Sequence, residues 1–207
     1  FISFSLFIIV IVLSFLPLSV WTIHFRVLPF IFSLGLGVFS FLLAKRLTQN
    51  FWAGVWFAFL NYFASSLGWI VTLVRTNQLG GESVFWSMQS SSFLLNPPFA
   101  LSILIILGGL ILWHKWQDKL DFKRMTVLIL LFSSLINIKA YAAVLVLAGL
   151  FIVNLLNLVF KKINYKQWLV WAGTAGLVGV YVLFFQKGGE FPFVFKPFWF
   201  VRTMFEA

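Results

Sequence analysis

One lysine stands inside a long apolar stretch of this chain and is the first candidate for chemistry. Lys139 is the only charged residue in the run from Met125 to Phe160. An ionisable group at such a position is costly in a membrane and usually faces a cavity or a partner. The alternative is a side chain that extends to the lipid headgroups. With Arg75, Lys196, Arg202 and the positive end of the fourth predicted span, Lys139 could form an electropositive outer pocket. Such a pocket suits a phosphate or pyrophosphate attached to a lipid.

The stretch from Leu79 to Ser102 concentrates polar groups that could contact a ligand. Asn96 and Pro97 predict a helix start, because asparagine caps helix N-termini and proline suits the first turn. The positive end of that helix would attract anions. Before it, Glu82–Leu95 is amphipathic and predicts a short helix at the membrane interface. Gln89 and Asn96 are the candidates to contact a sugar or an acceptor.

Carboxylates that could serve in acid–base catalysis are scarce. On the side that charge counting assigns to the outside, they are Glu82, Glu190 and Glu206. A general base would be one of these or lie on a part of the protein beyond this chain. Glu82 is the best placed, although Glu82 and Gln89 could instead be solvated groups of an interfacial anchor.

Metal and nucleotide motifs are absent from the sequence. There is no P-loop, GxGxxG, HExxH or GxSxG, and the lack of cysteine excludes thiolate chemistry. The predicted topology puts His24 and His114 on opposite sides of the membrane, so they cannot share a metal. No cofactor is therefore identified.

The composition indicates that membrane helices position these residues. Hydrophobic residues make up 62% of the chain and charged residues 10%, whereas a soluble domain is about 25% charged. The ten Trp and 28 Phe residues suit membrane interfaces, where aromatic side chains collect. We therefore expect an all-α, polytopic transmembrane bundle that forms a single domain over residues 1–207. The net charge of +10 lies in short loops, so nucleic acid is not an expected partner.

Apolar runs of about 20 residues predict membrane-crossing helices. They are Phe1–Val20, Val27–Ala44, Phe51–Val74, Pro97–Trp113 and Trp168–Phe185. Between the first two, Val20–Arg26 is expected to be an outer loop. The run Met125–Phe160 is too long for one span and predicts a hairpin with arms Met125–Ile136 and Ala140–Leu158, broken at "NIKAY". The first arm would be about 18 Å long, so the turn would lie below the outer surface and need protein or water around it. About seven helical segments result, plus the interfacial helix.

The positive-inside rule then predicts the orientation. One set of loops carries nine of the 15 basic residues: Lys45, Arg46, Lys115, Lys119, Lys123, Arg124, Lys161, Lys162 and Lys166. We therefore expect the protein to lie in the plasma (inner) membrane, with loops 45–50, 114–124 and 161–167 on the cytoplasmic side. Segments 75–96 and 186–207 would lie outside.

Small and polar residues form stripes on two predicted spans. The third span carries seven of them at alternating spacings of four and three: Gly54, Ala58, Asn61, Ser65, Gly68, Thr72 and Arg75. This stripe could be a helix-packing seam or, towards Arg75, the lining of a cavity. On the last span, Ala172, Gly176 and Gly179 predict a packing seam.

The outer stretch "GGESVFWSMQSSSFLLNPPFALS", the break at "NIKAYA" and the tail "GEFPFVFKPFWFVRTM" resemble parts of bacterial GT-C-type membrane glycosyltransferases. The resemblance implies transfer of a sugar from a polyprenyl-phosphate-linked donor on the outer face, with membrane lipids and that donor as partners. Arg75, Lys139 and Arg202 would hold the phosphate. The acidic pair typical of the family's first outer loop is missing from Val20–Arg26, which suggests a fragment whose catalytic residue, and any divalent metal site, lies upstream.

Two other classes fit the same features. A transporter or flippase would place its substrate at a discontinuous helix near Lys139, although no inverted repeat is visible. A non-catalytic membrane assembly protein explains the composition but not the lysine.

Overall fold

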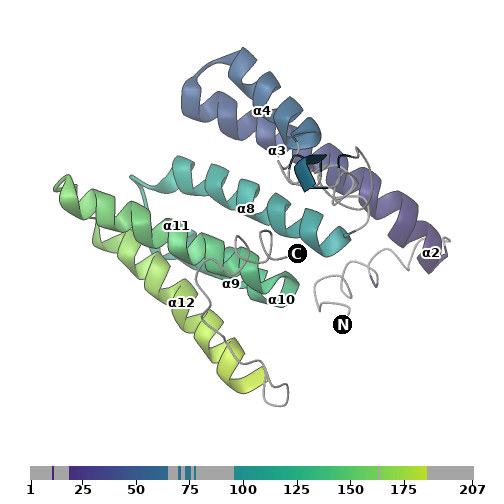
Figure 1. Ribbon diagram of the computed structural model, residues 1–207. Helices are drawn as coiled ribbons and strands as arrows, with labels where there is room; N and C mark the ends of the chain where they lie inside the picture. The colour runs from purple at the N-terminus through teal and green to yellow at the C-terminus, as the bar shows by residue number, and fades with distance from the viewer. Residues whose placement is uncertain are drawn as a thin grey trace.

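The computed structural model describes residues 11, 19–64, 70, 73–75, 77, 96–162 and 164–185. These residues form helices and turns without a β-strand. The helices, labelled as in Figure 1, are α2 (Val20–Thr22), the π-helix η1 (Ile23–Val27), α3 (Leu28–Thr48), α4 (Phe51–Phe63), α8 (Pro97–Trp116), α9 (Phe122–Ser133), α10 (Leu135–Ile138), α11 (Ala140–Val159) and α12 (Tyr165–Phe185).

In the part of the chain that the structure describes, four stretches of helix are long and apolar enough to cross a membrane: Phe25–Thr48, Pro97–Trp116, Ala140–Val159 and Tyr165–Phe184. The prediction of an all-α membrane protein is therefore confirmed. The predicted interfacial helix Glu82–Leu95 and the outer tail 186–207 lie outside the described residues, as does most of the first predicted span.

The first long helix starts earlier than the sequence predicts. The loop expected over Val20–Arg26 is helical, because α2, η1 and α3 follow one another without interruption. The backbone N–H of Leu28 donates to the carbonyl of Ile23, five residues back. Pro29 has no N–H to donate to the carbonyl of Phe25, so a wider π-turn is well suited to this point.

Helices α3 and α4 form a hairpin whose contact face includes the start of the predicted stripe. A side chain added at Gly54 would place its Cβ 2.7 Å from Phe41 on α3. Two helical turns further, Asn61 donates a hydrogen bond from its amide nitrogen to the hydroxyl of Ser40. This part of the stripe is a packing seam, with small and polar residues that allow close approach.

The third predicted span is not one continuous helix. Helix α4 ends at Phe63, and Ala64 has the extended dihedrals φ −63° and ψ 138°. Its 13 residues measure about 20 Å, less than the ~30 Å hydrocarbon core. In the sequence Ser65 and Ser66 follow, and such hydroxyls compete with helical backbone hydrogen bonds. The seven-residue stripe therefore does not continue along one helix face, and its members Ser65, Gly68 and Thr72 lie outside the described residues.

Helix α8 lies between the α3–α4 hairpin and the remaining helices (Figure 1). Close contacts at two glycines show that α8 runs parallel to α3. Gly35 faces Leu104, and one turn on, Phe39 faces Gly108. Buried apolar residues fill both sides of α8, towards α3 and towards α9 and α11.

The predicted hairpin in the long apolar run is confirmed, with its break at Lys139 between α10 and α11. Its first arm is longer than predicted, because α9 and α10 together cover Phe122–Ile138, interrupted only around Ser134. That length is at most about 25 Å. At the turn end the helix extends through Asn137 and Ile138, so the break is confined to Lys139.

The packing seam predicted on the last span is not formed among the described residues. None of their atoms lies within 4 Å of a Cβ built at Gly176 or Gly179, and Ala172 is exposed. The close contact is at Gly173, where a Cβ would lie 2.7 Å from Ile129 of α9. The spacing of small residues identifies a helix face, but α9 packs on the neighbouring face.

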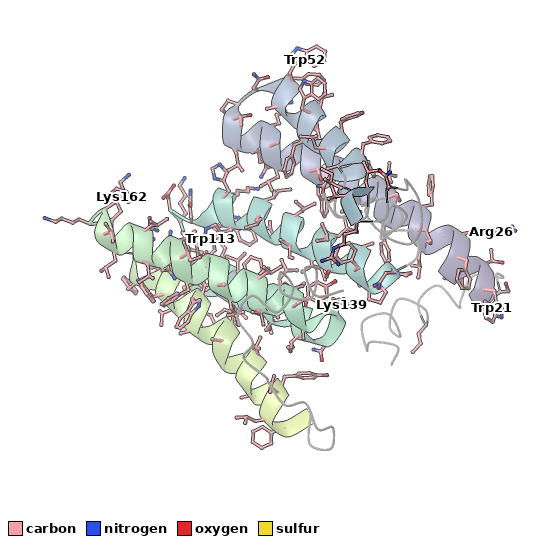
Figure 2. All side chains as sticks on the ribbon, viewed as in Figure 1. Trp21, Arg26, Trp52, Trp113, Lys139 and Lys162 are labelled. Atoms are coloured by element: carbon pink, nitrogen blue, oxygen red, sulfur yellow. The ribbon has the colours of Figure 1, made fainter. Side chains whose placement is uncertain are left out.

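The three basic loops of the orientation argument lie at one end of the molecule. The side-chain amide of Asn164 donates to the carbonyl of Gln117 (3.3 Å), and the ammonium of Lys166 donates to the carbonyl of Leu120 (2.7 Å). The loop after α3 lies at the same end, since α3 and α8 are parallel. Figure 2 shows Lys162 and Arg26 at opposite ends. The assignment of the Lys162 end to the cytoplasm stays a prediction.

Candidate functional site

Lys139 occupies the turn between two helices that run in opposite directions. Its φ of −153° and ψ of 111° are extended. Its N–H donates to the carbonyl of Leu135 (2.8 Å), and its own carbonyl accepts from Ala142 (3.0 Å) and Ala143 (3.4 Å). The residue thus ends α10 and starts α11 without a side-chain cap, which leaves its ammonium group available for other partners.

The ammonium of Lys139 lies over the aromatic ring of Tyr141, 6.0 Å from the ring centroid. This is the outer limit of a cation–π contact, worth about 0.5–1 kcal/mol at an exposed site. The lysine is half-buried and Tyr141 is exposed. Such a contact holds the charge close to the turn, and it can be kept while the ammonium binds an anion.

Asn96 caps α8, as the sequence predicts. Its side-chain oxygen accepts a hydrogen bond from the N–H of Phe99 at 3.4 Å, and its backbone carbonyl accepts from Phe99 and Ala100. Pro97 follows at the first helical position. The oxygen of Asn96 is thus used in the cap, while the amide nitrogen remains as a donor for a ligand.

An aromatic contact brings the ends of α8 and α11 together. The rings of Phe99 and Tyr141 have centroids 6.4 Å apart. Asn96 and Lys139 therefore lie at the same end of the molecule, opposite the basic loops. The structure brings these two predicted site residues into one neighbourhood.

The other predicted site residues are not assembled in the part of the chain that the structure describes. Arg75 closes the helical segment 73–75 and is exposed, with no ion pair or hydrogen bond to a described residue. Gln89, Arg202 and Glu82 lie outside the described residues.

An apolar groove of about 490 Å³ lies along α8, between α3 and α9. Its lining consists of Phe39, Leu42, Leu101, Leu104, Ile105, Gly108, Ile111, Leu112 and Leu131. The groove begins at Leu101, which follows Phe99 by only two residues, and it continues towards the basic end. Because no polar side chain lines it, a hydrocarbon chain is the ligand that it suits.

Acidic or metal-binding groups do not gather among the described residues. Within them no three His, Asp or Glu side chains could hold a common metal ion. The ion pair between Arg124 and Asp121 (3.8 Å) lies at the basic end, where Asp121 caps α9. The region around Lys139 can thus bind and orient an anion, and it offers no general base among the described residues.

Sequence reasoning missed the aromatic pair Phe99 and Tyr141. The signal was present, because an aromatic residue stands two positions after Lys139 in "NIKAYA". It could not be interpreted without the fold, since only the packing of α8 on the hairpin brings Phe99 to it.

Comparisons of this chain with protein-family models, with curated proteins and with solved structures find no match.

Proposed function

We propose that this chain is part of a GT-C-like membrane glycosyltransferase that takes a sugar from a lipid-phosphate-linked donor on the outer face. The observation that carries the proposal is the placement of Lys139. Its cation stands in a backbone break, beside the first turn of α8 and at the end opposite the basic loops. A lipid phosphate lies at headgroup level, and the length of the α9–α10 arm brings the lysine towards that level.

The apolar groove along α8 supports the lipid part of the proposal. A donor whose phosphate meets Lys139 would have its hydrocarbon chain in the membrane core. The groove offers such a chain an apolar bed that begins two residues after Phe99. Asn96 and Gln89 would contact the sugar or the acceptor, and Arg75 and Arg202 would add positive charge. The catalytic acid would lie at Glu82 or on another part of the protein.

A transfer assay with the natural protein that contains this chain tests the proposal. Purified protein is incubated with polyprenyl-phosphate-linked hexoses, and release of polyprenyl phosphate is measured. We expect release by the wild type and a loss of about tenfold or more in Lys139→Ala, because a charge-assisted hydrogen bond contributes about 1.5–3 kcal/mol. Lys162→Ala is the matched control at the basic end. No release by the wild type would exclude the transferase, and unchanged release by Lys139→Ala would exclude this phosphate site.

The extended backbone at Lys139 also favours a second candidate, a transporter with a discontinuous helix at its substrate site. A single cysteine at position 139 separates the two. Labelling from both membrane faces in alternation would support transport, whereas labelling from the outer face alone supports the transferase.

A further inference from the structure

A second pocket, of about 330 Å³, lies on the other side of the hairpin, between α9–α10 and α12. Its polar lining is Ser133, Ser134 and Asn137 from the hairpin and Tyr181 from α12, with Leu177 and Val180 beside them. No charged side chain lines it. Its polar side chains distinguish it from the apolar groove along α8. The pocket is large enough for a small ligand, since such pockets start at about 300 Å³.

The side chains of Ser133, Ser134 and Asn137 can form further hydrogen bonds with a ligand. The hydroxyls of Ser133 and Ser134 donate to the carbonyls of Leu130 (3.2 Å) and Leu131 (2.7 Å). Their donor hydrogens are used, so their oxygens remain as acceptors. The side-chain amide of Asn137 makes no hydrogen bond to a described residue. It provides donors and an acceptor.

The position of the pocket along the hairpin indicates what the pocket contains. Ser134 lies at the interruption between α9 and α10, about 7 Å along the helix from Lys139. Asn137 lies between these two residues, and its side-chain amide is a polar group without a hydrogen bond to a described residue. Inside a membrane such a group is tolerated where it lines a water-filled cavity. Acceptors and donors without a charge suit hydroxyl groups better than a phosphate, which calls for cations.

We propose that this pocket is a water-filled binding site for an uncharged, hydroxyl-bearing group, such as a single glycosyl unit. The two serine oxygens would accept hydrogen bonds from ligand hydroxyls, and the Asn137 amide would donate and accept. The pocket can be tested separately from the transfer reaction, because hydration and ligand class are measured without turnover.

The absence of cysteine from the sequence allows single-cysteine variants to test hydration. Ser134→Cys and Val144→Cys form a matched pair, since each stands five residues from Lys139 along one arm of the hairpin. Ser134 lines the pocket, whereas Val144 is 55% exposed on the surface of α11. In proteoliposomes, a charged, membrane-impermeant thiol reagent should modify Ser134→Cys about tenfold faster or more, because charged groups are excluded from the bilayer core. Asn137→Cys provides a second reporter in the pocket.

Ligand class is tested by protection of the same two cysteines. Octyl glucoside below its micelle-forming concentration should slow their modification at least about twofold, while octyl phosphate at equal concentration should not. Modification of both reporters as slowly as Val144→Cys, in variants that elute as folded protein, would overturn the hydrated pocket. Equal protection by both compounds, or protection by neither, would overturn the assignment of an uncharged hydroxylated ligand.

Discussion

Single polar residues inside the bundle differ in how well their hydrogen bonds are satisfied. Asn154 on α11 is only 1% exposed, and its side-chain oxygen has no partner among the described residues. Its amide nitrogen makes a long bond of 3.4 Å to the carbonyl of Gln167 on α12. The neighbouring Asn157 makes a better one, 2.8 Å from its amide nitrogen to the side-chain oxygen of Gln167. The two asparagines should therefore respond differently to removal.

Asn154→Leu should leave the thermal stability unchanged or raise it, because burial of an unpaired oxygen costs about 1–3 kcal/mol. Asn157→Leu should lower it, by about 1 kcal/mol or more, because the buried oxygen of Gln167 loses its donor. The measurement is the midpoint of thermal unfolding of purified protein in detergent. A larger loss in Asn154→Leu than in Asn157→Leu would contradict this interpretation of the two residues.

Asn96 should contribute to the stability of the protein through the cap of α8. Asn96→Ala removes the acceptor for the N–H of Phe99 and should destabilise the protein by about 0.5–1 kcal/mol, the lower part of the range for caps, because the 3.4 Å bond is long. Asn96→Ser should retain most of the stability, since serine caps equally well. The midpoint of thermal unfolding reports both, and equal losses in the two variants would show that the cap contributes nothing.

At the scale of helices, close packing is concentrated at particular glycines. Gly54 on α4 faces a ring and a backbone carbonyl of Phe41, at 2.7 and 2.9 Å from a built Cβ. A Cβ built at Gly176 on α12 has no atom of a described residue within 4 Å. These two glycines therefore differ in their packing, although both stand in apolar helices.

Gly54→Ala should destabilise the α3–α4 hairpin by about 1–3 kcal/mol, because the added methyl group meets backbone atoms that cannot move away cheaply. Gly176→Ala should stabilise α12 by about 0.5–1 kcal/mol through helix propensity. The midpoints of thermal unfolding of the two variants, measured side by side, should shift in opposite directions. A gain in both variants would exclude the α3–α4 contact.

The helices show which features of a sequence predict structure and which do not. Apolar length and the Asn96–Pro97 cap predicted α8 correctly, because both are local properties. The break at Lys139 was predictable for the same reason, since an ionisable residue interrupts an otherwise uniform run. The end of α4 at Phe63 was missed, because apolar residues such as Leu67 and Trp69 resume in the sequence after Ser65 and Ser66. The π-turn before Pro29 was missed, because His24 and Arg26 interrupt the apolar run and predicted a loop there. The Phe99–Tyr141 contact depends on how helices pack, which spacing alone does not determine.

The whole molecule has two chemically different ends. One end carries the basic loops, tied together by the bonds from Asn164 and Lys166. The other carries the turn at Lys139 and the cap at Asn96. This polarity was predictable from charge counting, whereas the gathering of Arg75, Gln89 and Arg202 around the turn remains a prediction.

Cysteine labelling in right-side-out and inside-out vesicles tests this polarity. Gln49→Cys, Lys119→Cys and Lys162→Cys should react from one membrane face, since their loops share an end of the bundle. Trp21→Cys, at the opposite end in Figure 2, should react from the other face. Reaction of Lys119→Cys and Lys162→Cys from different faces would mean that the run Met125–Phe160 crosses the membrane once.

The central claim is that Lys139 binds the phosphate of a lipid. The most direct measurement compares the binding of geranylgeranyl phosphate and geranylgeraniol to purified protein by calorimetry. The two ligands share one hydrocarbon chain and differ in the phosphate. Wild-type protein and the control Lys162→Met should bind the phosphate about tenfold or more tightly than the alcohol, the factor that a charge-assisted hydrogen bond supplies. Lys139→Met should lose that preference, and a Lys139→Met protein that keeps the wild-type preference would contradict the claim.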